Sequence, residues 1–306
     1  MQEKKIINYL KALRLERWPR SFAIYIGTFS FFLLYPQKIV FSLNLFVKII
    51  LAFLFTWGIS TANYIINEIA DAPFDQHHPI KRTRPLAAGK VSRNILLILF
   101  FIMTLSSIIF AYLYFGKNYT IYLIALLIAG FFYNIPPIRL KDIPIVDFVS
   151  ESINNPIRFL IGWYAFARVE FPPYLLLIWW WFFGMFLMIG KRIAEKRFLG
   201  EESSQAYRPS LKNVSEKVLF YFMVFTGFLS FALILLFGIQ FKIITFVVFS
   251  FPFAVFLIWM IYTINKKRGE LEEPEELLKN PFLSIIIFIL TFIFFISLYI
   301  EKVAGK

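Results

Sequence analysis

Three oxygen-bearing side chains recur every four residues at the end of an apolar stretch: Asn67, Asp71 and Asp75. Side chains four residues apart share one face of an α-helix, so these groups are predicted to point the same way. Carboxylate and amide oxygens are ligands for a hard divalent cation such as Mg2+. The cation would hold a diphosphate, and the spacing therefore predicts a metal-dependent phosphate site. A solvated helix end with scattered charges is the alternative interpretation.

Basic residues follow this acidic face. Lys81, Arg82 and Arg84 come within a few residues of it. They are predicted to bind the phosphate oxygens that the cation leaves free. Tyr133 and Lys141, in a proline-broken connection further along, are additional candidates for substrate binding. An acidic cluster at the end of an apolar helix is costly unless it is solvated, paired or metal-bound, which favours a functional site.

A second charged group follows a later apolar run. Lys191 and Glu195 are four residues apart, and so are Arg192 and Lys196. Glu195 is predicted to supply a further oxygen ligand to the metal, with Lys191 and Arg192 on phosphate. The alternative is a basic helix beside the membrane whose surface ion pairs stabilise little.

Asn154 and Arg158 lie inside another apolar run. An arginine in a membrane span costs about 2.5–3.5 kcal/mol on insertion scales, so it normally faces a polar cavity and has a partner. The two residues share a helix face and are predicted to line the same cavity as Asp71. The alternative is a structural pair between Arg158 and either Asp147 or Glu151.

Composition places these groups in a membrane protein. The chain has 306 residues, of which 59% are hydrophobic and 17% charged, with a mean hydropathy of +0.69. A soluble domain of this length is rarely so apolar. Cysteine is absent, which excludes disulfides and thiolate metal sites. The net charge of +13 fits a bias of basic residues towards the cytoplasm better than nucleic-acid binding.

Apolar runs of about 20 residues predict an all-α, polytopic protein in one domain, 1–306. Residues 1–20 read as an amphipathic helix at the membrane interface. The pattern predicts two four-helix halves and a last helix. The nine predicted spans are about 21–36, 43–70, 94–115, 119–134, 145–167, 173–194, 214–238, 243–264 and 282–300. Pro73, between Asp71 and Asp75, is expected to end the second helix, so that Asp75 would reach the site from a loop.

Basic residues concentrate in alternate connections of this predicted topology. The loops at 71–93, 135–144, 191–213 and 265–280 carry most of them, whereas the opposite loops are short and carry few. The asymmetry predicts a multi-pass protein with its N-terminus and the loops 71–93 and 191–213 in the cytoplasm.

The motif Asn67-x3-Asp71-x3-Asp75 with its tail KRTRPLAAGKVS resembles the first signature of the UbiA superfamily of intramembrane prenyltransferases. The opening LKALRLERWPRS and the YNIPPIRLKD loop fit the same family. The resemblance implies a helical bundle in the cell membrane around a central cavity that opens laterally to lipid. It implies two acidic motifs that hold Mg2+ and a diphosphate. The implied activity is Mg2+-dependent cleavage of a diphosphate donor, with transfer of its polyprenyl group to an acceptor.

The chain departs from the family pattern at two places. Glu68 stands where the first motif often has Asp, and KRIAEKR, with only Glu195 at a matching position, replaces an Asp-rich second motif. This second version, with YRPSL and EEPEELLKNPF, resembles the branch that joins phosphoribose to a polyprenyl phosphate. Phosphoribosyl transfer is therefore the alternative activity, and a polyprenyl phosphate is the alternative lipid substrate. A transporter of organic phosphates is the alternative of another class, although its charges would be expected deep in both leaflets.

We predict that a cysteine at position 88 reacts with a membrane-impermeant thiol reagent only from the cytoplasmic side, because the loop 71–93 is basic. Labelling is simple to read in a chain with no native cysteine. Lys38→Cys, in an opposite loop, is the control and is expected to react only from outside. Labelling of Ala88→Cys from outside alone would refute the orientation.

Overall fold

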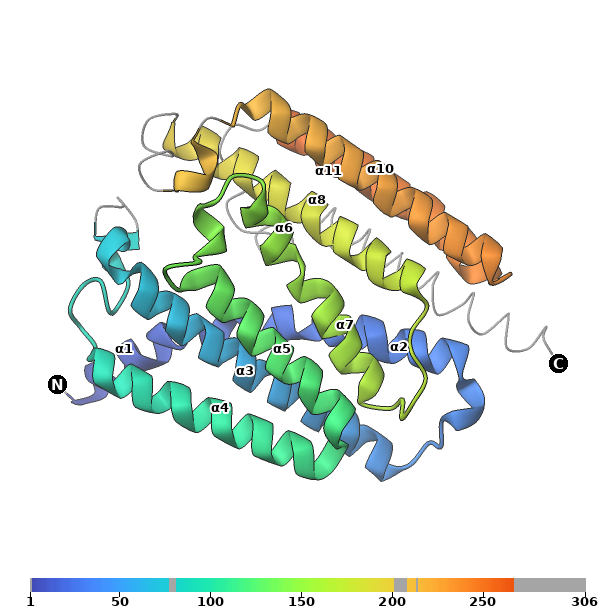
Figure 1. The fold of residues 1–306 in the computed structure, drawn as a ribbon, viewed down its shortest axis with the longest axis horizontal. Helices are drawn as coiled ribbons and strands as arrows, with labels where there is room; N and C mark the ends of the chain where they lie inside the picture. Colours follow the sequence, from blue (N-terminus) through green and yellow to red (C-terminus); the bar gives the residue numbers. More distant parts are fainter. Residues whose placement is uncertain (1, 77–80, 201–207, 213, 267–306) are drawn as a thin grey trace. The chain divides into compact units, whose positions relative to one another are not determined.

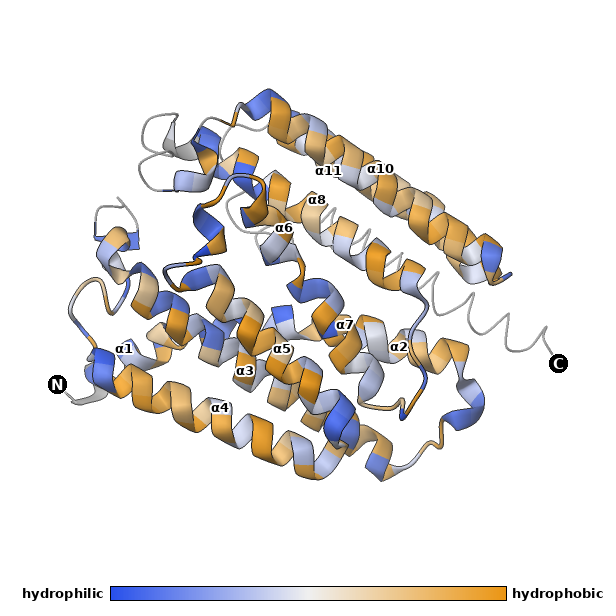
Figure 2. Ribbon diagram, in the orientation of Figure 1, coloured by the Kyte–Doolittle hydropathy of each residue, from blue (hydrophilic) through white to orange (hydrophobic). Residues whose placement is uncertain are grey.

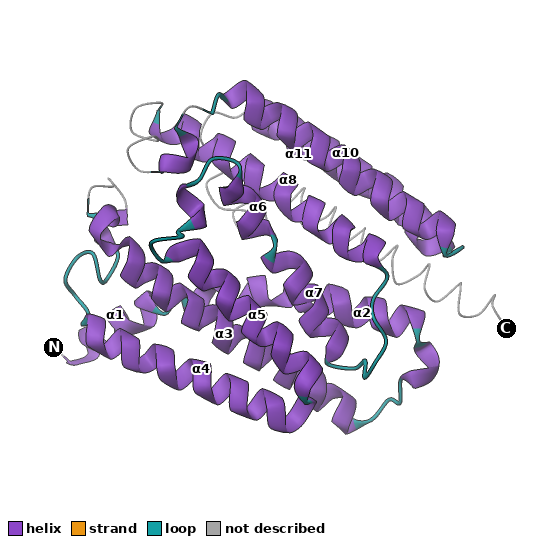
Figure 3. Ribbon diagram, in the orientation of Figure 1, coloured by secondary structure: helices purple, strands orange, loops and turns teal. Residues whose placement is uncertain are grey.

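In a computed structural model, the described residues are 2–76, 81–200, 208–212 and 214–266, and all their regular secondary structure is helical (Figure 3). The predicted all-α class is therefore confirmed. Five helices in this part of the chain are long and apolar enough to cross a membrane by length and composition. They are α3 (Leu43–Asp75), α4 (Arg93–Phe115), α8 (Tyr174–Leu199), α10 (Glu216–Gln240) and α11 (Ile244–Lys266).

The chain forms two compact units. The first comprises Met1–Ile143 and Ile153–Pro172, and the second comprises Pro144–Ser152 and Pro173–Lys306. In the first unit, α3 packs against α4 and α5, and α7 packs against α2 and α5 (Figure 1). Its other helices are α1 (Gln2–Ala12), α2 (Ile24–Leu34), α5 (Lys117–Asn134) and α7 (Asn154–Tyr164), with 3-10 turns η1 (Leu15–Ala23), η2 (Pro36–Lys38), η3 (Lys81–Thr83) and η4 (Leu140–Asp142).

In the second unit, α8 packs against α10 and against the short helix α6 (Val146–Ser152), and α10 packs against α11 (Figure 1). A 3-10 turn, η5, covers Pro209–Leu211. The helices α10 and α11 are apolar along most of their length (Figure 2), and large side chains such as Phe228 and Ile258 are exposed on them. An exposed apolar surface of this extent is suited to contact with lipid.

The helix α3 extends further than the sequence predicted. Pro73 lies inside it and Asp75 is its last residue, so the expected end at Pro73 is wrong. Pro73 has no N–H to bind the carbonyl of Ile69, and its ring crowds that carbonyl. The side chain of Asp75 is held by an ion pair with Arg84, which favours the helical last turn. Asp75 therefore stays on the same helix as Asn67.

The N-terminal segment is not one amphipathic helix over 1–20. It comprises α1 and η1, which are separated at Arg14 by a left-handed backbone conformation with φ 49° and ψ 45°. Ala12, Leu13 and Arg14 are buried at this break, whereas Ile6 and Leu10 on α1 are exposed. The interfacial position of α1 stays a prediction.

The predicted helix 145–167 is also divided. α6 ends at Ser152 and α7 begins at Asn154. Pro156 has no N–H to bind the Ser152 carbonyl, which breaks the hydrogen-bond ladder at this point. The two pieces belong to different units, because Ile153 begins the second segment of the first unit.

The predicted loop at 191–213 starts as helix, since α8 continues to Leu199. Each of the other spans predicted before residue 270 has a helical counterpart. The ninth predicted span, 282–300, and the loop 265–280 beyond Lys266 lie outside the described residues. The count of nine spans therefore stays a prediction.

The helices α2 and α7 cross at two glycines. A Cβ on Gly162 would lie 1.8 Å from the carbonyl oxygen of Ile24, and one on Gly27 would lie 1.9 Å from that of Phe159. The hydroxyl of Thr28 donates to the Gly162 carbonyl at 3.0 Å. Small residues let membrane helices approach backbone to backbone, and the two glycines allow α2 and α7 to do so here.

We predict that Gly162→Ala lowers the free energy of unfolding by at least about 1–3 kcal/mol, because backbone atoms must separate to admit the methyl group. Gly227→Ala is the matched control in the second unit, where the added Cβ meets only ring carbons of Phe186, the nearer at 3.0 Å. Thermal unfolding of the purified variants in detergent measures both. Equal stability of the two variants would contradict the close crossing.

Candidate functional site

The acidic face of α3 is surrounded by basic side chains, and we name these residues the α3 cluster. Its members are Asn67, Asp71, Asp75, Arg84, Asn134, Arg139 and Lys141. Asp71 Oδ1 accepts hydrogen bonds from Lys141 Nζ and, at 3.2 Å, from Arg139 Nη2. The structure thus brings Lys141, a predicted substrate-binding residue, into contact with Asp71.

Two asparagines link this ion pair to α3. Asn67 Nδ2 donates to Asn134 Oδ1 at 2.6 Å, and Lys141 Nζ donates to the same oxygen at 3.0 Å. Asn134 is buried and its own amide donates to the Gly130 carbonyl at 2.9 Å. The Asn134 oxygen, at the end of α5, thus binds both the Asn67 amide on α3 and the Lys141 ammonium.

Arg139 is held in place by several contacts. Its Nε donates to Asp142 Oδ2 at 2.7 Å, and its Nη1 donates to the Ala70 carbonyl at 3.3 Å. Its guanidinium lies 4.3 Å from the ring centroid of Phe74. Such a fixed cation can interact with an anion without a large loss of side-chain entropy. The sequence does not predict Arg139 or Asn134 as site residues, although both lie in the YNIPPIRLKD segment.

Asp75 is buried and pairs with Arg84, whose Nη1 lies 2.6 Å from Asp75 Oδ2. Its other oxygen, Oδ1, is buried and has no hydrogen-bond partner among the described residues. A buried carboxylate oxygen without a partner is costly unless a ligand satisfies it.

The other predicted residues of the first unit are less tightly placed. Arg82 is exposed, and Lys81 and Tyr133 are partly buried. Asn154 and Arg158 lie one turn apart on α7, both partly buried, and their role in lining a cavity stays a prediction.

The second unit contains another group of charged residues, which we name the α8 cluster. Its members are Asp147, Glu151, Arg192, Glu195, Arg208 and Ser210. Arg192 is 1% exposed. It binds Asp147 in a bidentate manner, through Nε at 2.5 Å and Nη2 at 3.1 Å. It also donates to Glu151 and, at 3.3 Å, to Glu195.

Asp147 is the centre of the α8 cluster. It also accepts hydrogen bonds from Arg208 Nη1 at 3.0 Å and from the Ser210 hydroxyl at 3.1 Å. Arg208 Nε lies 3.3 Å from Glu195 Oε2. The sequence suggests Asp147 only as a partner of Arg158, and its spacing does not predict the contacts with Arg192 and Arg208. The carboxylates of Asp147 and Glu151 both bind Arg192.

The interpretation of Glu195 and Arg192 as exposed surface ion pairs is wrong, because both side chains are buried. Lys191 is partly buried on the same helix, and Lys196 Nζ donates to the Val214 carbonyl at 2.6 Å. The structure thus makes Glu195 part of a buried network on α8 rather than a loop residue.

The α3 cluster suits a hard cation that a substrate helps to bind. No three His, Cys, Asp or Glu side chains gather as a metal site within the described ranges. However, Mg2+ is commonly held by one or two carboxylates and substrate phosphates rather than by a full protein cage. Asp71 and Asp75, with the unpartnered Oδ1 of Asp75, fit that mode of binding.

Comparisons with known proteins identify relatives of the chain. A model described as the UbiA prenyltransferase family matches residues 24–286. A solved UbiA homologue from Archaeoglobus fulgidus, bound to DMAPP and Mg2+, superposes with a TM-score of 0.71 at 18% identity, over 96% of this chain and 99% of that one. A structure of digeranylgeranylglyceryl phosphate synthase superposes with a TM-score of 0.65 at 19% identity, over 96% and 99%. These structures show a shared fold.

A relative with a known activity is more similar in sequence. The decaprenyl-phosphate phosphoribosyltransferase of Mycobacterium tuberculosis is 25% identical over 237 residues, which are 75% of this chain and 74% of the relative.

We predict that Arg192→Met lowers the free energy of unfolding by about 3–5 kcal/mol, because it leaves the buried carboxylate of Asp147 without its bidentate partner. Arg168→Met, which makes the same change at an exposed position, is the control. Thermal unfolding in detergent is the measurement. If the two variants unfold at the same temperature, the α8 cluster does not depend on Arg192.

Proposed function

Because the chain belongs to the UbiA prenyltransferase family, we propose that it cleaves a diphosphate donor in an Mg2+-dependent reaction and transfers its polyprenyl group to an acceptor. The observation that carries this proposal is the α3 cluster. It combines three cations with a buried carboxylate oxygen of Asp75 that has no hydrogen-bond partner in the part of the chain that the structure describes. The solved homologues bound to DMAPP or GPP with Mg2+ support the same assignment.

The charges of the α3 cluster suit a diphosphate. Asp71 and Asp75 carry two negative charges, and Arg84, Arg139 and Lys141 carry three positive charges. Mg2+ bound by Asp71, Asp75 and Asn67 would neutralise the charge that develops on the leaving diphosphate. Arg84, Arg139 and Lys141 already lie at this place and can donate to phosphate oxygens.

The remaining assignments are part of the same proposal. Glu195 is proposed as a metal ligand, and Lys191 and Arg192 are proposed to bind phosphate. Lys81 and Arg82 would contact phosphate from the loop after α3, and Tyr133, Asn154 and Arg158 would line the substrate cavity. A polyprenyl chain would lie among Phe- and Leu-rich helices in the cell membrane, at about 0.8 kcal/mol for each buried methylene.

Phosphoribosyl transfer to a polyprenyl phosphate is the second candidate. The identity with the Mycobacterium tuberculosis enzyme over three-quarters of the chain favours it. So does the α8 cluster, in which Glu195 lies among arginines where an Asp-rich motif was expected. Both candidates use a diphosphate leaving group, and the α3 cluster serves either.

Two assays of the purified protein with Mg2+ distinguish these activities. One reaction contains prenyl diphosphate and a panel of acceptors, and the other contains phosphoribosyl diphosphate and a polyprenyl phosphate. Diphosphate release with a lipid product in the first reaction supports prenyl transfer, and in the second it supports phosphoribosyl transfer. Release in neither reaction, with uptake of an organic phosphate into proteoliposomes, would favour a transporter.

We predict that turnover stops in excess chelator and that Asp71→Asn slows it by about ten- to a hundredfold, the effect of losing one charged contact of about 1.5–3 kcal/mol. Glu195→Gln is expected to slow it similarly, because Glu195 is proposed as a metal ligand. Initial rates of diphosphate release measure these effects.

Glu216→Gln is the control, because Glu216 is an exposed carboxylate that pairs with Arg197 on the second unit. It is expected to leave the rate unchanged. Full turnover of the wild-type protein in excess chelator would refute the metal site, and a wild-type rate for Glu195→Gln would refute the role of Glu195 as a metal ligand.

A further inference from the structure

A buried ion pair adjoins the α3 cluster but includes none of its members. Arg14 Nη2 donates to Glu68 Oε2 at 2.7 Å, and the two side chains are 9% and 1% exposed. Glu68 directly follows Asn67 on α3, and Arg14 lies at the break between α1 and η1. The pair therefore connects the N-terminal segment to α3 at the residue that follows Asn67, a candidate metal ligand.

The second oxygen of Glu68 has a separate partner. Glu68 Oε1 accepts a hydrogen bond from the backbone N–H of Leu86 at 3.3 Å. Leu86 lies two residues after Arg84, whose guanidinium binds Asp75 at 2.6 Å. One carboxylate thus contacts both the N-terminal segment and the loop that delivers Arg84. We name Arg14, Glu68 and the Leu86 amide the Glu68 clamp.

The loop that the clamp holds is braced by its own backbone. Ala88 N–H donates to the Arg84 carbonyl at 2.8 Å, and Lys90 N–H donates to the Pro85 carbonyl at 2.8 Å. Gly89 closes the turn with a φ of +68°, where glycine has no steric cost. Fixing Leu86 therefore also fixes Arg84 within this compact turn.

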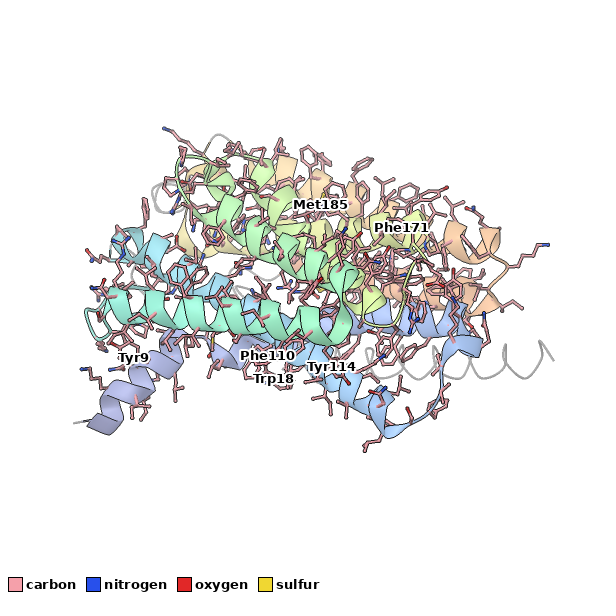
Figure 4. The ribbon with its side chains drawn as sticks, turned by 60° about the horizontal axis from the view of Figure 1, so that its bottom comes forward. Tyr9, Trp18, Phe110, Tyr114, Phe171 and Met185 are labelled. Carbon is pink, nitrogen blue, oxygen red and sulfur yellow. The ribbon has the colours of Figure 1, made fainter. Side chains whose placement is uncertain are left out.

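The N-terminal segment supports the loop from a second direction. The hydroxyl of Tyr9, labelled in Figure 4, accepts a hydrogen bond from the backbone N–H of Ser92 at 3.0 Å. The Leu86 side chain packs against a buried apolar cluster that includes Leu13 and Ile65. The loop thus lies between contacts with α3 on one side and with the N-terminal segment on the other.

The charges of the clamp explain why an acidic residue is needed at position 68. Burial lowers the pKa of Arg14, the positive charge of Arg84 lowers it further, and Glu68 raises it. Arg14 and Arg84 thus repel each other, and the carboxylate of Glu68 offsets that repulsion.

We propose that Glu68 is a positioning residue, which with Arg14 holds the loop 84–90 against α3 so that Arg84 stays on Asp75 and meets the donor diphosphate. Its two oxygens are committed to Arg14 and Leu86, so it is not a metal ligand. The effect on the donor rests on the proposed function, whereas the effect on the loop does not.

Glu68→Gln tests the charge of the clamp, with Glu16→Gln as the matched control at an exposed position near Arg14. Loss of one charge-assisted contact is expected to raise the donor KM by about tenfold or more, with kcat nearly unchanged. Hydrogen exchange of peptides covering 81–92 is expected to accelerate in Glu68→Gln only. A purely structural pair would change stability without this separation of KM from kcat.

Removing one partner of a buried ion pair can prevent folding, because the other charge stays buried. The double variant Arg14→Met with Glu68→Met removes both charges together and avoids that cost. It is expected to fold and to show the same raised donor KM and the same faster exchange of the loop.

The outcomes separate the clamp from the proposed function. Wild-type exchange of the 81–92 peptides in the folded double variant overturns the clamp, whatever the activity. Faster exchange with a wild-type donor KM overturns the positioning role. If the wild-type protein releases no diphosphate from either donor, the proposed function fails, and the exchange comparison still decides on the clamp.

Discussion

The cost of burying a charge away from water governs the arrangement of both units. An unpaired ion in an apolar interior costs several kcal/mol, so buried charges persist where the chain supplies an opposite charge. Arg14 with Glu68, Asp75 with Arg84, and Arg192 with Asp147 each meet this condition. The positions of the loops then follow, because the partner of each helix-borne charge lies on a connection or on another helix.

This pairing also shapes what a substrate encounters. The carboxylates of α3 are already neutralised by Lys141, Arg139 and Arg84 before any ligand arrives. A diphosphate donor would exchange the contacts of these cations with carboxylates for contacts with phosphate oxygens. The negative charge of the donor would therefore be paired when it enters the site. Fixed polar groups that replace water in this way need little reorganisation during a reaction.

The sequence predicted the parts of this arrangement that depend on local spacing. The four-residue spacing predicted that Asn67, Asp71 and Asp75 share a helix, and the apolar runs predicted the all-α class and most of the helices. Both signals lie within a few turns of one helix. Contacts between distant segments were not predictable in this way. Asn134 with Asn67, and Arg208 with Asp147, are brought together by packing, and no periodicity reports them. The helix continues through Pro73 to Asp75, which pairs with Arg84, whereas local rules favour its interruption.

The division of the predicted fifth helix at Ile153 has a consequence for the order of synthesis. α6 belongs to the second unit but precedes α7, which belongs to the first. A chain made from its N-terminus therefore completes the first unit only after a piece of the second has already emerged. Asp147 on α6 can form its ion pair with Arg192 only after α8 has been synthesised. The two units cannot mature one strictly after the other, and no single cut in the chain would yield both of them whole.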